Sequence, residues 1–225
     1  DNWSSVAGGL SYSLALKSDG GIYAWGLNAN SQLGLQDTLV RSSPTQVSTS
    51  SFTLITATTT GAFSSAIRTD NTLFNWGINT GTQLGLLDTI QRSSITQLGS
   101  TQSGLWTLVP VPTQIGLSSW SQVASGASFS LAIRTDSGVF AWGQNANSQL
   151  GLNDTITRSS PTQISTSSFT LVEANHFATT GTGFALRTDS TLFAWGVNAV
   201  GQLGLQDTLT RSSPTQHGSS QTGNY

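Results

Sequence analysis

The sequence predicts an all-β fold assembled from four copies of one module. Three observations carry this prediction: a repeat runs through the chain, short apolar runs alternate with turn residues, and no stretch keeps a helical period. The copies align without a gap from eight residues before an anchor tryptophan to twenty-one residues after it. The anchor tryptophans, which we expect to form the core of each repeat, are Trp25, Trp76, Trp142 and Trp195.

The first elements expected in each module are two strands joined by a tight turn. In the third copy, residues 130–135 alternate small or apolar residues with polar ones, and Asp136-Ser-Gly138 supplies a turn. Residues 139–142 then form the returning strand. The first copy has the same turn at Asp19-Gly-Gly21. Short apolar runs separated by Asp, Gly and Asn turns predict antiparallel hairpins.

The next element is a loop of the form Asn-x-x-x-Gln-Leu-Gly. We expect its leucine to pack back into the core and its glycine to permit a tight backbone path. One module is too small to bury its own apolar face, so neighbouring modules must stack. The loop glycines are Gly34, Gly85, Gly151 and Gly204.

The modules fall into two pairs, because odd copies open with Trp3 or Trp120 and even copies open with Phe52 or Phe169. The predicted divisions are residues 1–98, the first pair; 99–117, an insertion; 118–217, the second pair; and 218–225, the start of a further linker. The insertion carries the unpaired Trp106 and is expected to lie outside the regular blades. Since residues 218–225 resemble the opening of the insertion, we expect a longer parent chain.

Nearly every charge belongs to the repeat. All eight Lys and Arg residues occupy two repeat positions, and eight of the ten acidic residues occupy two others; Asp1 and Glu173 are the exceptions. Asp37 and Arg41 lie four residues apart, and so do their counterparts in every copy, which predicts a recurring local ion pair. No basic patch exists outside the repeat, so a nucleic-acid partner is not expected.

Composition favours an exterior setting. Only 8% of the 225 residues are charged, against roughly 25% in an ordinary globular domain. The chain has no Cys, which excludes disulfides and thiolate metal sites, and it has no Met. No apolar run is long enough to span a membrane. A neutral polar surface suits an extracellular or virion-surface protein, with a cytoplasmic location as the alternative.

The repeated residues resemble the RCC1 (regulator of chromosome condensation) repeat family. The first copy matches that family's pattern at Ala15-Leu16, Asp19-Gly20, Tyr23-Ala-Trp25-Gly26, Asn28 and Gln32-Leu-Gly34. The resemblance implies a β-propeller of four-stranded blades. Well-known members have seven blades, which four modules cannot supply, so this chain would be an arc of a larger propeller, a ring completed by another chain, or a smaller closed ring.

One departure separates the chain from the family pattern. The family's histidine is replaced by Tyr12, Phe63 and Phe129, with Phe184 near the fourth position. This change favours a divergent member of bacterial or phage type over a nuclear exchange factor. The Gly-Trp-Arg-His-Thr motifs of plant ultraviolet-receptor propellers are also absent, so the anchor tryptophans are interpreted as blade core.

The sequence offers no convincing catalytic, cofactor or metal site. His176 and His217 are the only histidines, and His217 replaces a closing Val, Leu or Ile of the other copies. Glu173 and His176 lie in the one stretch that breaks the repeat, and the expected counterparts of Glu173, Thr56 and Gln122, are both uncharged. One His and one Glu do not make a zinc site. The residues predicted to contact a partner are Trp106, Glu173, His176 and Phe177.

We therefore expect a non-enzymatic structural or binding propeller on an exterior surface, such as a virion or phage appendage or a secreted adhesin. Its expected partners are other protein subunits or a surface receptor. Two alternatives stay open: a regulator of a small GTPase or of chromatin, and a secreted enzyme-inhibitor propeller. The first alternative would need copy-specific charged residues, and the second would need copy-specific aromatic residues.

Overall fold

The computed structural model describes residues 2–60, 62–98, 119–175 and 181–218. These residues form sixteen β-strands in four separate antiparallel sheets of four strands each. Strands that follow one another in the sequence are neighbours in the sheet, so each module folds as one meander. The predicted all-β class, with one four-stranded blade per module, is confirmed.

The strands have closely matched bounds from blade to blade. The first blade contains β1 (Trp3–Gly8), β2 (Tyr12–Lys17), β3 (Ile22–Gly26) and β4 (Arg41–Ser48). The second contains β5 (Phe52–Ala57), β6 (Phe63–Arg68), β7 (Leu73–Gly77) and β8 (Arg92–Gln97). The third contains β9 (Trp120–Ser125), β10 (Phe129–Arg134), β11 (Val139–Gly143) and β12 (Arg158–Ser165). The fourth contains β13 (Phe169–Ala174), β14 (Thr182–Arg187), β15 (Leu192–Gly196) and β16 (Arg211–Gln216).

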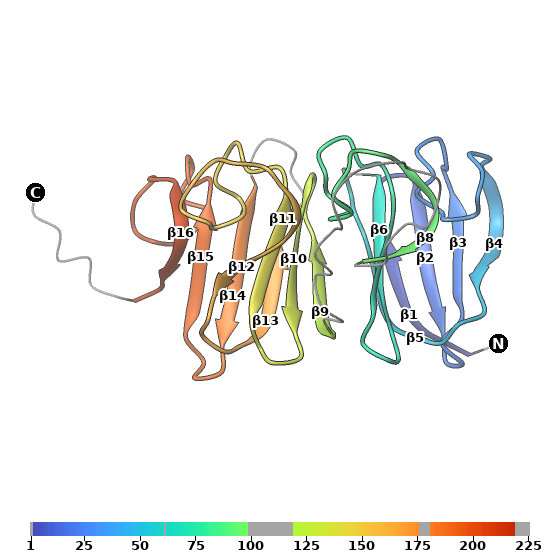
Figure 1. The fold of residues 1–225 in the computed structure, drawn as a ribbon, viewed down its shortest axis with the longest axis horizontal. Coiled ribbons are helices and arrows are strands. Elements are labelled where there is room, and N and C mark those ends of the chain that lie inside the picture. The colour runs from blue at the N-terminus through green and yellow to red at the C-terminus, as the bar shows by residue number, and fades with distance from the viewer. Residues whose placement is uncertain (1, 61, 99–118, 176–180, 219–225) are drawn as a thin grey trace, which may run out of the picture.

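The four blades stack in sequence order, with the first and fourth blades at opposite ends (Figure 1). The first strands of consecutive blades, β1, β5, β9 and β13, contact one another and form the inner row. The described blades therefore form an open arc of a propeller. The long connections between third and fourth strands lie along one edge of the arc, the upper edge in Figure 1, and the short turns between second and third strands lie along the other.

The hairpins form as their turn residues predict. In the third blade, the backbone N–H of Arg134 donates to the carbonyl of Gly138, 2.9 Å away, and closes the turn between β10 and β11. The carboxylate of Asp136 accepts a hydrogen bond from the N–H of Gly138 inside the turn. Lys17 and Gly21 close the corresponding turn of the first blade.

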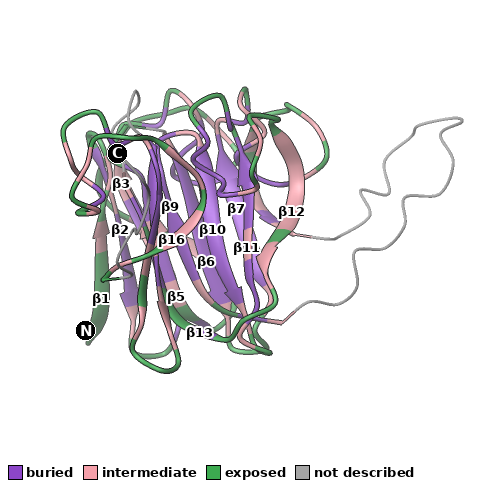
Figure 2. Ribbon diagram, turned by 90° about the vertical axis from the view of Figure 1, so that its left-hand side faces the viewer, coloured by how far each residue is buried: buried purple, intermediate pink, exposed green. Residues whose placement is uncertain are grey.

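The core lies between blades rather than within one. One cluster of buried residues joins Leu14, Leu16 and Leu33 of the first blade to Phe52 and Trp76 of the second. Figure 2 shows buried residues along the middle strands and exposed residues along β1 and the loops. This arrangement follows from the size of a blade, since one four-stranded sheet cannot cover its own apolar face.

A tryptophan closes each of the three joints between blades. The indole Nε1 of Trp76, Trp142 and Trp195 donates, across a distance of 2.9 Å, to the backbone carbonyl of a glutamine in the preceding blade. All three indoles are fully buried. Trp25 has the same place on its strand, but it is only half-buried because none of the described residues forms a blade before the first. Burial of all four anchors was expected, and that expectation is wrong for Trp25. The three acceptor residues are Gln32, Gln83 and Gln149.

The loop leucines and glycines behave as expected. Leu33 and its three counterparts are buried, and Gly34 has a φ of 74°, in the left-handed region. A Cβ on Gly34 would lie 2.9 Å from the Trp76 indole nitrogen, so only glycine leaves room for the tryptophan of the next blade.

The hairpin register corrects the assignment of Phe184. Tyr12, Phe63 and Phe129 each pair with the glycine of the following strand, and the residue that does so in the fourth blade is Thr182. Tyr12 also keeps a hydrogen-bonding role: its hydroxyl donates to the carbonyl of Phe63, 2.7 Å away in the second blade. Burial of this hydroxyl raises the pKa of Tyr12.

Candidate protein-binding surface

The loop between β3 and β4 is held by a network that involves one Asn, one Asp and one Arg. The amide Nδ2 of Asn28 donates to the backbone carbonyl and the carboxylate of Asp37, at 2.9 and 3.0 Å. The Oδ1 of Asn28 accepts from the N–H of Leu33. The Asp37 carboxylate also accepts from the N–H of Leu39 and pairs with Arg41 at 2.5 Å. The Arg41 guanidinium then donates to the carbonyl of Leu39, which fixes the backbone on both sides of that leucine.

All four described blades repeat this network with similar distances. The recurring ion pair predicted from the four-residue spacing is thereby confirmed in every copy. Each network ties together residues of one blade only, so it shapes the loop and leaves the joints to other contacts. The other three sets are Asn79, Asp88 and Arg92; Asn145, Asp154 and Arg158; and Asn198, Asp207 and Arg211.

Each network presents to solvent the aliphatic side chain that lies two residues after its aspartate. Leu39, Ile90, Ile156 and Leu209 have exposed fractions of 64%, 57%, 63% and 64%. They lie at the same place in the four connections along the upper edge of Figure 1. We call these four residues the tip row. Four aliphatic residues on fixed loops, spaced one per blade, make a candidate protein-binding surface, because preorganised loops lose little entropy when they bind.

Hydrogen bonds and ion pairs lower the pKa values of three of the loop aspartates, which stabilises these carboxylates as anions. The N–H of Leu39 and the Arg41 guanidinium lower the pKa of Asp37 below its ordinary value. Arg211 does the same to the pKa of Asp207. Burial acts to raise the pKa of Asp154, but the N–H of Ile156 and the Arg158 side chain outweigh it and lower the pKa. A carboxylate stabilised as an anion is a poor general acid or base near neutral pH.

The second set of charges forms ion pairs on the hairpin edge. Arg68, Arg134 and Arg187 each pair with the Asp two residues later, and the pairing raises the pKa of each arginine and lowers that of its aspartate. The first blade has a lysine here, and the Nζ of Lys17 lies 4.6 Å from the ring centre of Tyr23. All seven arginines are therefore paired with an aspartate of their own blade.

Glu173 is the one predicted partner-contacting residue within the described part of the chain. It lies on the inner strand β13, is exposed, and pairs across the hairpin with Phe184. The same pairing shows that its counterpart in the third blade is Ala124; the interpretation of Gln122 as that counterpart is wrong, whereas Thr56 is correct. The other three predicted residues, Trp106, His176 and Phe177, lie outside the described residues, as does the insertion at 99–117.

The repeat pattern itself contains a signal for the tip row. Each copy places a Leu or Ile two residues after the loop Asp, inside a largely polar stretch.

Among residues 2–60, 62–98, 119–175 and 181–218, no group of three or more His, Asp or Glu side chains could hold a metal ion. The same residues contain no helix long and apolar enough to cross a bilayer.

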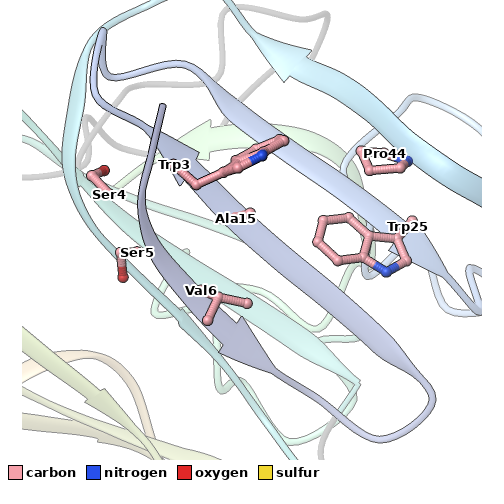
Figure 3. A pocket seen from close by; sticks show the side chains of 7 residues that line it. All are labelled: Trp3, Ser4, Ser5, Val6, Ala15, Trp25 and Pro44. Atoms are coloured by element: carbon pink, nitrogen blue, oxygen red, sulfur yellow. The ribbon is translucent and has the colours of Figure 1, made fainter. Parts of the chain in front are cut away.

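A pocket of about 420 Å³ lies on the outward face of the first blade. Figure 3 shows the rings of Trp3, Trp25 and Pro44 around it, with Ala15 between the two indoles. This is the face that the later blades turn toward their predecessor. Of the residues that line the pocket, Trp3, Val6 and Trp25 have counterparts that are buried in the other three blades.

The repeat of this chain matches known sequence families. The family described as "Regulator of chromosome condensation (RCC1) repeat" matches residues 19–67, 70–133, 136–179 and 189–223, and a second family of the same description matches residues 3–32 and 120–149. The chain is 30% identical over 216 residues to the ultraviolet-B receptor UVR8 of Arabidopsis thaliana, covering 93% of this chain and 44% of the plant protein. It is 37% identical over 97 residues to the probable E3 ubiquitin-protein ligase HERC3 of Homo sapiens, covering 41% of this chain and 9% of the ligase.

Solved structures agree with the fold. Human WBSCR16 superimposes with a TM-score of 0.78 at 23% identity, covering 96% of this chain and 53% of that one. Prp20p of Saccharomyces cerevisiae, whose structure was reported with its binding properties to Gsp1p and histones, gives a TM-score of 0.75 at 19% identity, covering 96% of this chain and 50% of that one. The chain thus spans about half the length of these propellers and less than half of the curated relatives named above.

Proposed function

Because the chain belongs to the RCC1 repeat family, we propose that it is a non-enzymatic, protein-binding part of a propeller that acts at an exterior surface through its tip row. The observation that carries the proposal is the repeated presentation of Leu39, Ile90, Ile156 and Leu209 on loops fixed by the Asn, Asp and Arg network. Its partner is another protein subunit or a surface receptor with a matching row of apolar sites.

The charges support binding over catalysis. Asp37 and its counterparts are tied to loop backbone and to arginine, so they serve the shape of the loops. The tip row repeats with the blade, which suits a partner that contacts several blades at once. Several weak contacts on one rigid body bind more tightly together than any contact alone, provided that the geometry lets all of them engage.

The composition supports the exterior setting. The low charge content and the absence of Cys and Met leave a surface of hydroxyl, amide and small apolar groups. A chromatin-binding or GTPase-regulating role would need charged residues that differ between copies, whereas all seven arginines here pair with an aspartate of their own blade. The exterior role is therefore preferred to the regulatory one.

The test compares two variants of the 225-residue chain in binding to proteins of the source's surface and secreted fractions. The tip variant replaces Leu39, Ile90, Ile156 and Leu209 by serine, and the control replaces Val6, an equally exposed aliphatic residue on β1, by serine. We expect the wild type and the control to retain one saturable partner from the surface or secreted fraction, and the tip variant to lose it. Equal binding by the tip variant, or a partner found only in the cytoplasmic fraction, would contradict the proposal.

A further inference from the structure

We propose that the joint between the second and third blades is a hinge, which opens more readily than the joints on either side of it. We call the three joints between described blades the first, middle and last joints, in chain order. Opening of the middle joint moves the first two blades as one body and the last two as another. The inference concerns the contacts between blades, so it does not depend on the tip row.

The centre of the middle joint is polar. Ser65 on β6 and Asn75 on β7 are cross-strand partners, so their side chains lie on the same face of the second blade. That face is turned toward the third blade, because the hydroxyl of Ser65 lies 3.4 Å from the hydroxyl of Ser125 on β9. All three side chains are buried. Three polar side chains therefore lie together where the stacking of blades excludes water.

The first and last joints are apolar at the same positions. In the first blade, the cross-strand pair is Leu14 and Ala24, and hairpin register gives Ala57 as the counterpart of Ser125. These three residues belong to one hydrophobic cluster that joins the first two blades. The apolar contact that crosses the two flanking joints is thus interrupted at the middle joint. The corresponding residues of the last joint, which belong to a second cluster, are Leu131, Ala141 and Ala174.

One polar atom in the middle joint has no partner. The amide Nδ2 of Asn75 donates to the carbonyl of Leu84, 2.8 Å away in the same blade. The Oδ1 of Asn75 is buried and has no hydrogen-bond partner in the described part of the chain. The contact between the two serine hydroxyls is also long, since O–H···O bonds usually measure about 2.7–2.8 Å. A buried acceptor without a partner is unfavourable, and opening the joint lets water reach it.

Each flanking joint has a side-chain contact that the middle joint lacks. The Tyr12 hydroxyl donates a hydrogen bond from the first blade to the second. In the last joint, the side chain of Gln122 donates to the carbonyl of Val172 and accepts from its N–H, at 3.2 and 3.0 Å. At the middle joint, Phe63 has the position of Tyr12 and Leu54 has that of Gln122. Neither side chain has a polar group, so neither can form these bonds.

The connection across the middle joint leaves the two halves room to move. Residues 49–51 join β4 to β5 and residues 166–168 join β12 to β13, so short links hold the flanking joints. The strands β8 and β9 are joined through residues 98–119, and a connection of that length sets no close limit on the distance between its ends. The bond from Thr82 Oγ1 to the Arg158 carbonyl, at 3.1 Å, does cross the middle joint. It involves the loop of the upper edge, so it restrains that edge rather than the polar centre.

Hydrogen exchange of the indole N–H groups compares the three joints directly. Trp76, Trp142 and Trp195 are fully buried, and each donates across 2.9 Å to the preceding blade, so they are matched reporters of the first, middle and last joints. In NMR spectra of the 225-residue chain in D₂O, we expect the Nε1–H of Trp142 to exchange roughly tenfold faster than the other two, or more, because the closed middle joint contains an unpartnered acceptor. A Trp142 indole protected as well as either of the others would overturn the proposal.

A repaired joint tests the cause of the opening. Ser65→Leu, Asn75→Ala and Ser125→Ala together give the middle joint the residue types of the flanking joints. We expect this variant to slow exchange at Trp142 by roughly tenfold or more, until it matches exchange at Trp76. A folded variant in which Trp142 still exchanges as fast as in the wild type would overturn the proposal.

A matched control separates the joint from the blade. Ser121→Ala removes an exposed hydroxyl of β9 that donates to the Ile133 carbonyl of its own blade, and it should leave the order of the three indoles unchanged. Circular dichroism verifies that each variant is folded. If the triple variant is not, Asn75→Ala alone removes the unpartnered oxygen and should slow exchange at Trp142, since alanine holds this position in the other three blades. Faster exchange in a folded Asn75→Ala variant would contradict the proposed cause.

Discussion

The indole Nε1 of Trp76 donates a hydrogen bond to the backbone carbonyl of Gln32, 2.9 Å away in the preceding blade. The same bond joins Trp142 to Gln83 and Trp195 to Gln149. A position that is repeated in every module thus stabilises the contact with the neighbouring blade as well as the module itself. Anchor tryptophans that occupy the same repeat position should therefore differ in how much they contribute to the stability of the chain.

Replacing Trp76 by alanine should destabilise the chain by about 3–5 kcal/mol, the cost of removing a large buried aromatic side chain. Trp25→Ala should cost only about 1–2 kcal/mol in dilute solution, because that indole is half exposed. Urea unfolding of both variants at low protein concentration measures the difference. Equal losses would show that the tryptophan acts within its own blade.

Gly85→Ala should cost about 2–4 kcal/mol. The residue has a φ of 68°, and an added Cβ would lie 2.8 Å from the Trp142 ring. Gly8→Ala is the matched control, since nothing lies within 4 Å of a Cβ at that position, and it should change stability by no more than about 0.5 kcal/mol. Thermal unfolding of the pair provides the measurement; a neutral Gly85→Ala would mean that the joint can shift to make room.

Asn145→Ala should cost about 2–4 kcal/mol, because it removes the bonds to Asp154 and leaves the buried N–H of Leu150 without an acceptor. Asn147 lies two residues later and is exposed, so Asn147→Ala should be close to neutral. Denaturant unfolding compares the two. If both were neutral, the loop would keep its shape without the asparagine.

Glu173→Ala should leave the free energy of unfolding within about 0.5 kcal/mol of the wild type in dilute solution, because the side chain is exposed and alanine occupies its position in two other blades. Urea unfolding measures the change, and a loss of more than about 1 kcal/mol would show that Glu173 makes a favourable contact within the folded chain.

Stability should fall in acid and change little between pH 5 and pH 8 on account of these groups. The folded state lowers the pKa of six loop and hairpin aspartates, so their anions are favoured in the folded chain. Their contribution is complete above the unfolded pKa of about 4 and is lost as pH falls further, through the lower folded pKa values. Thermal unfolding from pH 2 to pH 8 measures the profile; a stability that rises on acidification below pH 4 would contradict it. The aspartates are Asp37, Asp70, Asp136, Asp154, Asp189 and Asp207.

Local spacing by itself determined the strands, the hairpin turns and the ion pairs. The partners in these features lie within a few residues of each other: Asp37 and Arg41 are four apart, and Asn28 and Asp37 are nine apart. Such short segments have few alternative arrangements, so residue type and spacing were sufficient to predict them. The position of the tip row could also be predicted from spacing, since each of its Leu or Ile residues follows the loop Asp by two residues.

The joints were decided only by the tertiary structure. Trp76 and Gln32 are 44 residues apart, and Trp142 and Gln83 are 59 apart, so no local pattern pairs them. The sequence describes Trp25 and Trp76 as equivalent, yet one is half-buried and the other fully buried, because burial depends on whether a neighbouring blade covers the face. The counterparts of Glu173 and of Tyr12 likewise depended on hairpin register, because the connection between the first two strands differs in length between blades: it runs from Gly8 to Tyr12 in the first blade and from Ala174 to Thr182 in the fourth. The sequence therefore determined what each blade is, and the stacking of blades determined which of the faces of the described blades are buried.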